Sequence, residues 1–117
     1  MLRRHESIIS LQNPKVKLWS QLLDKKGRDK QGAYLVEGVH LVQEALTWHA
    51  PIETLLYSEL RGIPAEVQAL LDAEDYSFEC IPVSEQVLAK CSDAQTPQPV
   101  IAVVAKAAHP PEQLLSA

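Results

Sequence analysis

The chain has 117 residues, 46% of them apolar and 22% charged, which is typical of one folded soluble domain and excludes a disordered chain. No apolar run approaches the roughly 20 residues that a membrane-spanning helix needs, and none near the start suits a signal peptide, so we expect a cytoplasmic protein. The net charge of −4 conceals an asymmetry: residues 1–30 hold eight basic residues against three acids, and residues 31–117 hold three against twelve. A basic end on an acidic body indicates one face for a phosphate-bearing partner.

The first predicted element is a helix over residues 14–26. Asn13 can cap the free amides of its first turn, and Pro14 suits the first helical position. The helix is expected to end at Gly27, which suits the left-handed conformation that closes many helices. The basic residues beyond Gly27 then fall on the loop that leads into the first strand.

Four strands alternate with helices in the rest of the chain. The strands are predicted at residues 32–36, 52–57, 78–81 and 100–105, and the helices between them start after Gly38, at Pro64 and at Ser84. Pro82 is expected to end the third strand, and the apolar first strand is expected to be buried on both faces. This alternation predicts an α/β sandwich of two or three layers around a parallel or mixed sheet. The expected core is Trp19, Leu22, Leu35, Val36, Leu41, Val42, Leu46, Leu70, Ile81, Val87, Leu88, Ile101 and Val103.

The two ends of the chain differ from this pattern. Residues 1–7 are expected to form a flexible basic arm, and residues 8–106 the folded domain. Residues 107–117 contain Pro110-Pro111 and are expected to begin a linker to a further domain.

No catalytic, cofactor-binding or metal-binding set stands out in the sequence. The four glycines are too scattered for a phosphate loop, and the four histidines lie far apart. Cys80 and Cys91 have no CxxC spacing and are expected to be reduced, partly buried thiols. His40 is expected to be a structural histidine. Glu37 and Glu44 have a helical spacing that permits paired-carboxylate chemistry, although a structural role explains them more simply.

Three stretches nevertheless stand in a distinctive order. Residues 10–17 read S-L-Q-N-P-K-V-K, residues 32–38 read G-A-Y-L-V-E-G, and residues 92–98 read S-D-A-Q-T-P-Q, followed closely by I-A-V-V. Together they resemble the amino-terminal substrate-binding domain of the SpoU (TrmH) family of RNA 2′-O-ribose methyltransferases, over residues 8–105. Two positions depart from that pattern. Ala94 stands where the family often has Thr, and Pro99 replaces a Gly and so removes an amide donor.

The resemblance implies a three-layer α/β/α sandwich with a four-stranded mixed sheet, similar to kink-turn-binding ribosomal proteins. It also implies that the chain recognises structured rRNA or tRNA for a separate carboxy-terminal knotted domain, which binds S-adenosylmethionine and performs catalysis. The motifs of that catalytic half are absent from the sequence, so this chain alone is not expected to be an enzyme or to bind the cofactor. Since the family dimerises through the catalytic domain, we expect this chain alone to be monomeric and the full-length protein to be a homodimer.

The candidate RNA-binding residues are the basic side chains that precede the first strand. They would contact phosphates, so that the RNA is recognised by shape and backbone rather than by stacking of single-stranded bases. The candidates are Lys15, Lys17, Lys25, Lys26, Arg28 and Lys30.

Three alternatives remain open. The basic cluster can be only a solvated helix face. The chain can be a protein-interaction or regulatory module that uses its acidic body, or a small-molecule-binding domain of flavodoxin type, which the lack of glycine loops disfavours. The acidic body comprises Glu66, Asp72, Glu74, Asp75 and Glu79.

Overall fold

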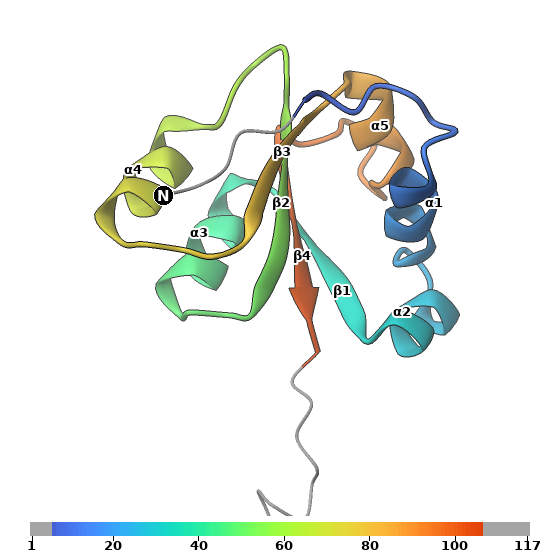
Figure 1. Cartoon of the computed structure of the whole chain (residues 1–117), viewed down its shortest axis with the longest axis horizontal. Coiled ribbons are helices and arrows are strands. Elements are labelled where there is room, and N and C mark those ends of the chain that lie inside the picture. Colours follow the sequence, from blue (N-terminus) through green and yellow to red (C-terminus); the bar gives the residue numbers. More distant parts are fainter. Residues whose placement is uncertain (1–5, 107–117) are drawn as a thin grey trace, which may run out of the picture.

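A four-stranded mixed sheet forms the centre of the computed structural model, which describes residues 6–106 (Figure 1). The strands lie in the order β1-β4-β2-β3, and β4 is antiparallel to both of its neighbours, whereas β2 and β3 are parallel. The prediction of a mixed sheet is therefore confirmed. The strands are β1 (Ala33–Glu37), β2 (Ile52–Ser58), β3 (Glu79–Val83) and β4 (Val100–Ala105).

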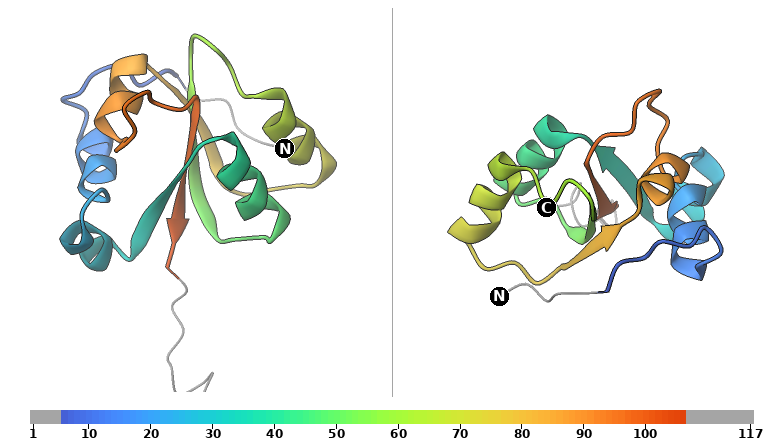
Figure 2. Two further views of the ribbon diagram at one scale, coloured as in Figure 1. Left: turned by 180° about the vertical axis from the view of Figure 1, so that it is seen from behind. Right: turned by 90° about the horizontal axis from the view of Figure 1, so that it is seen from above.

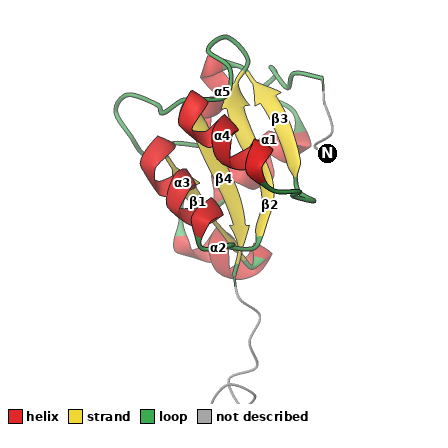
Figure 3. Ribbon diagram, turned by 90° about the vertical axis from the view of Figure 1, so that its left-hand side faces the viewer, coloured by secondary structure: helices red, strands yellow, loops and turns green. Residues whose placement is uncertain are grey.

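Helices cover both faces of this sheet, as Figures 1 and 2 show. On one face lie α1 (Pro14–Gln21), α2 (Lys25–Gln31) and α5 (Glu85–Lys90). The other face carries α3 (Val39–Thr47) and α4 (Ala65–Ala73), which stand in front of the strands in Figure 3. The three-layer α/β/α sandwich is thus confirmed. The longest helices described, α3 and α4, have nine residues each and are too short to cross a membrane.

The side chains of β4 alternate between two hydrophobic cores, which explains why the whole strand is apolar. Ile101 and Val103 pack with residues of α1 and α5, whereas Val100, Ala102 and Val104 pack with residues of α3 and α4.

The two cysteines lie in different cores. Cys80 belongs to the core beneath α3 and α4, and Cys91 to the core beneath α1 and α5. Both are free thiols, as expected. Burial raises the pKa of each thiol to about 11, so neither is a thiolate near neutral pH.

Three sequence predictions about burial and strand ends are wrong. The first strand is not buried on both faces, because β1 lies at the edge of the sheet and the side chain of Tyr34 is 36% exposed. Leu41 is 52% exposed, because Val42 and Leu46 turn toward the sheet and leave it on the outer side of α3. Pro82 lies within β3 rather than ending it. Since β3 is also an edge strand, the missing amide of Pro82 costs no ladder bond.

The largest difference from the sequence prediction is a break in the first helix. A single helix over residues 14–26 is wrong: α1 ends at Gln21, and Asp24 begins a second helix by accepting a hydrogen bond from the Gly27 amide, at 2.8 Å. Gly27 therefore lies in the first turn of α2, where it is buried. The left-handed residue that closes a helix is instead Gly32, with φ of 65°.

This break places the basic residues of 25–30 on a helix and not on a loop. The expected basic arm at residues 1–7 lies largely outside the described residues, and the expected linker at 107–117 lies wholly outside them. The described chain is tied into the sheet from Ile8, whose amide donates to the Pro82 carbonyl at 2.9 Å.

Candidate nucleic-acid interface

The six candidate RNA-binding residues lie on two helices that pack against each other, α1 and α2. Lys15 and Lys17 are exposed on α1, which begins where the Asn13 side chain accepts a hydrogen bond from the Lys15 amide, at 2.8 Å. The other four residues are on α2. All six candidates therefore lie on this one helix pair.

Within α2, Lys26 and Lys30 come together at one hollow. They are one helical turn apart, and both line a hollow of about 220 Å³ that also contains Gln21, Asp24 and Gly27. The Asp24 carboxylate caps α2 through the Gly27 amide and keeps its negative charge, so with the two exposed ammonium groups this hollow has a net positive charge. Such an arrangement suits an anionic group such as a phosphate.

Lys25 belongs to a different arrangement, an ion-pair triad around Asp29. The Lys25 ammonium lies 2.6 Å from one carboxylate oxygen of Asp29, and the Lys106 ammonium lies 2.7 Å from the other. Hydrogen bonds from Lys106 and Lys25 lower the pKa of Asp29 to about 2. Part of the positive charge of Lys25 is therefore compensated by its own helix, and the triad ties α2 to the end of β4.

The triad makes the stability of the fold depend on pH. Because the pKa of Asp29 is lower in the folded chain than its ordinary value of 3.8, its contribution is present above pH 4 and is lost as the pH falls toward about 2. We expect Asp29→Asn to melt at a lower temperature than wild type at pH 7, with the gap closing by pH 2. Thermal unfolding, followed by circular dichroism between pH 7 and pH 2, measures this difference in melting temperature. An unchanged gap at pH 2 would contradict the assignment to the Asp29 charge.

Arg28 faces a second hollow, separate from that of Lys26 and Lys30. It is half-buried, and its Nη1 donates to the Leu22 carbonyl at 3.2 Å, so it also supports the turn between α1 and α2. The hollow has a volume of about 360 Å³ and includes the carboxylates of Glu37 and Asp93. Arg28 thus shares its hollow with two acidic residues, an arrangement that the sequence prediction of a uniform phosphate-binding set did not contain.

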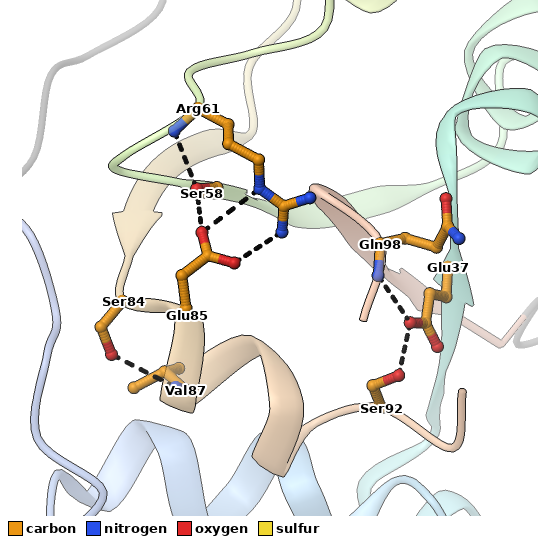
Figure 4. A network of polar contacts seen from close by, with 8 residues as sticks. All are labelled: Glu37, Ser58, Arg61, Ser84, Glu85, Val87, Ser92 and Gln98. Atoms are coloured by element: carbon orange, nitrogen blue, oxygen red, sulfur yellow. Dashed lines mark hydrogen bonds and ion pairs between the residues drawn. The ribbon is translucent and has the colours of Figure 1, made fainter. Parts of the chain in front are cut away.

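Glu37 connects the end of β1 to the loop over residues 92–98 (Figure 4). Its Oε2 accepts a hydrogen bond from the Ser92 hydroxyl and another from the Gln98 amide, the latter at 3.3 Å. The structural role expected for Glu37 is therefore confirmed, but its partners were missed. The signal was present, because Glu37 belongs to the second distinctive stretch and both partners belong to the third.

Pro99 keeps a backbone role even though it lacks an amide donor. Its carbonyl accepts a hydrogen bond from the Ser58 amide at 2.9 Å, which joins the loop to the end of β2.

A second polar network in Figure 4 lies at the end of β2 and was not predicted. The buried Ser58 hydroxyl donates to Glu85 Oε2 and accepts from the Arg61 amide at 2.9 Å, while Arg61 Nη2 lies 2.6 Å from Glu85 Oε1. The hydrogen bonds from Ser58 and Arg61 lower the pKa of Glu85. These contacts join the start of α5 to the end of β2 and so hold the helix against the sheet.

The described residues form neither a cluster of metal ligands nor a common glycine-rich loop. Among residues 6–106, no three His, Cys, Asp or Glu side chains gather as metal ligands, and His40 is paired with Glu44 at 3.4 Å on the surface of α3. Gly27 and Gly38 line different hollows, so they build no common glycine-rich cradle.

The fold and the basic helix pair define an α/β binding domain, and comparison with known proteins identifies its family. Residues 13–102 match the model of the MRM3-like substrate binding domain. The chain belongs to this family, which confirms the resemblance to the substrate-binding domains of the SpoU/TrmH methyltransferases.

Its relatives are considerably longer proteins. The 23S rRNA (guanosine(2553)-2′-O)-methyltransferase RlmP of Bacillus subtilis is 32% identical over 111 residues, which are 95% of this chain and 40% of that protein. The crystal structure of an RNA 2′-O ribose methyltransferase matches 88% of this chain and 38% of its own, with 32% identity and a TM-score of 0.75. An AdoMet-bound rRNA methyltransferase from Sinorhizobium meliloti matches with 29% identity and a TM-score of 0.68, over 92% of this chain and 39% of its own. The chain thus spans about two fifths of the relatives that it matches.

Proposed function

We propose that this chain is the RNA-recognition domain of an S-adenosylmethionine-dependent RNA 2′-O-ribose methyltransferase. The observation that supports it most directly is the match of residues 13–102 to a substrate-binding family whose relatives are methyltransferases of rRNA by name. In this proposal, residues 8–106 bind structured rRNA or tRNA in the cytoplasm, residues 1–7 form a basic arm, and residues 107–117 lead to the catalytic domain.

Catalysis and cofactor binding then belong to the rest of the protein. A methyltransferase of this kind moves a methyl group from the sulfonium of S-adenosylmethionine to a ribose hydroxyl, and this chain supplies neither the cofactor cradle nor a base. Its own contribution is to hold the RNA in a fixed position, which lowers the entropic cost of bringing ribose and methyl donor together. The full-length protein is proposed to be a homodimer, and this chain alone a monomer.

The basic side chains of α1 and α2 would perform the binding, with unequal roles. Lys26 and Lys30 are the best-placed phosphate contacts, because both line one hollow. Lys15 and Lys17 extend the same helix pair as exposed charges. Lys25 would contribute less, since it already pairs with Asp29.

Salt-dependent RNA binding tests this proposal. We expect the 117-residue chain to bind a 23S rRNA fragment that spans position 2553, the nucleotide in the name of the Bacillus subtilis relative. Affinity should fall linearly with the logarithm of salt concentration, because each contacted phosphate releases counterions. Fluorescence anisotropy measures the affinity at each salt concentration. An acidic polypeptide of the same length as the RNA fragment serves as a control anion. Absence of RNA binding at low salt would overturn the proposal and favour a protein-interaction module that uses the acidic body.

A further inference from the structure

The hollow beside Arg28 has a composition that phosphate binding does not explain. Its volume is about 360 Å³, within the range of small-molecule pockets. Two kinds of charged side chain line it, a guanidinium and two carboxylates, with apolar residues completing the walls. The Tyr34 side chain points to the other face of the sheet, because Tyr34 pairs with Val104 of the core beneath α3 and α4. The lining residues are Leu22, Leu23, Arg28, Tyr34, Leu35, Glu37, Cys91 and Asp93.

The charges of this hollow select against simple ions. Two carboxylates and one guanidinium give a net negative charge, which disfavours a phosphate, and the guanidinium of Arg28 disfavours a cation. A neutral, planar ligand with both donors and acceptors suits it better. Unpaired RNA bases are such ligands, and proteins read them by hydrogen bonds to their edges.

The polar groups of the hollow are held in place before any ligand arrives. Arg28 is fixed by the Leu22 carbonyl through Nη1, at 3.2 Å, which leaves the other guanidinium donors for a ligand. Glu37 is fixed by Ser92 and Gln98, and within residues 6–106 both of these hydrogen bonds go to Oε2, so Oε1 retains its acceptor sites. Asp93 is exposed at the rim and forms no hydrogen bond or ion pair with the described residues.

We propose that the hollow lined by Arg28, Glu37 and Asp93 binds one unpaired guanine base of the RNA. Guanine presents two adjacent donors, N1–H and the N2 amino group, which can share the free acceptor sites of Glu37 Oε1, and two adjacent acceptors, O6 and N7, which match an arginine fork. Adenine and cytosine each place a donor beside an acceptor and would leave part of the carboxylate unsatisfied. Glu37 reads the donor edge, and Arg28 reads the acceptor edge.

The site also gives Arg28 a role different from that of the lysines of α2. Lys26 and Lys30 line the hollow beside the start of α2, and Arg28 lines this one. A strand of RNA that places its phosphates on the lysines can therefore insert a base on the other side of the same helix. This inference rests on the proposed RNA function and adds a sequence preference to it.

Short RNAs test the inference directly. The 117-residue chain is titrated at low salt with single-stranded pentamers of uridine whose central base is guanine, adenine, cytosine or uracil. We expect the guanine pentamer to bind about tenfold more tightly than the others, because a bidentate contact discriminates by this order. Inosine, which lacks the N2 amino group, and 7-deazaguanine, which lacks N7, should each lose most of that advantage. Equal affinity for all four bases would overturn the proposal.

Matched variants identify the groups that read the base. Glu37→Gln should abolish the preference for guanine over inosine, and Arg28→Lys the preference over 7-deazaguanine while keeping the charge. Asp72→Asn, an exposed acid on α4 whose carboxylate accepts from Gln68, makes the same charge change away from the hollow and should have no effect. Glu37→Gln could also disturb the 92–98 loop, so base binding is followed in the wild-type chain as well, by amide chemical shifts. Addition of the guanine pentamer should shift the amide signals of Ser92 and Asp93. Retention of salt-dependent RNA binding without base preference would refute this inference and leave the proposed function intact.

Discussion

Gly27→Ala is expected to destabilise the fold by about 3 kcal/mol, although alanine is the better helix former. A Cβ at Gly27 would lie 1.9 Å from the Gln21 carbonyl oxygen and 2.6 Å from its carbon. Both are backbone atoms at the end of α1, so no side chain can rotate away, and α2 must move as a unit. Helix propensity alone predicts the opposite sign, a gain of about 1 kcal/mol.

Urea unfolding followed by circular dichroism measures the free energy of unfolding of this variant. Gly32→Ala is the matched control, because a Cβ there meets nothing within 4 Å and only the φ of 65° opposes it. Its expected cost is about 1 kcal/mol. If Gly27→Ala is as stable as wild type, α1 and α2 are not packed as closely as described.

The break between α1 and α2 also shows which part of the fold the sequence could predict. Asn13, Pro14 and Ser84 are correct as helix starts, because capping depends on local hydrogen bonds. Gly27 was misread as a helix end, since a glycine after two lysines resembles one. The missed signal was Asp24, three residues before Gly27 and well placed to cap its amide. Such a glycine can end a helix or allow another backbone segment to approach closely. Which of the two occurs depends on the neighbouring segment in space, and the local sequence does not contain this information.

Burial was predicted correctly for the central strand β4, but not for β1, whose burial depends on its position in the sheet. β4 is apolar throughout and lies between β1 and β2, so its burial followed from composition. β1 is nearly as apolar but lies at an edge, and Tyr34 is exposed there. An edge position is set by the long-range pairing of β1 with β4, about seventy residues away in sequence.

The candidate site was predictable in location but not in its division of roles. Clustered charge indicated the helix pair, because a count of lysines and arginines needs no structure. A count of basic residues treats Lys25, Lys26 and Arg28 as equivalent. The fold separates them: Lys25 pairs with Asp29, Lys26 lines a hollow with Lys30, and Arg28 lines another with Glu37. Those differences arise from a helix break and from residues that approach from β1 and the 92–98 loop.

This division of roles leads to a second expected result, for the double variant Lys26→Ala/Lys30→Ala. If both side chains contact phosphates, the slope of log affinity against log salt should decrease by about two units. Affinity for the 23S rRNA fragment at low salt should fall about tenfold, since each charge-assisted contact is modest at an exposed position.

The control for this variant is Lys25→Ala/Lys106→Ala, which removes the same total charge. Both of its lysines already pair with the single Asp29 carboxylate, so their ammonium groups are less available to phosphates than those of Lys26 and Lys30. We expect its slope to change by less than one unit. Equal effects of the two double variants would mean that only total charge matters, and no effect of Lys26→Ala/Lys30→Ala would reduce the basic cluster to a solvated helix face. A large effect confined to Lys26 and Lys30 would instead locate the phosphate path beside the start of α2, next to the hollow that holds Arg28 and Glu37.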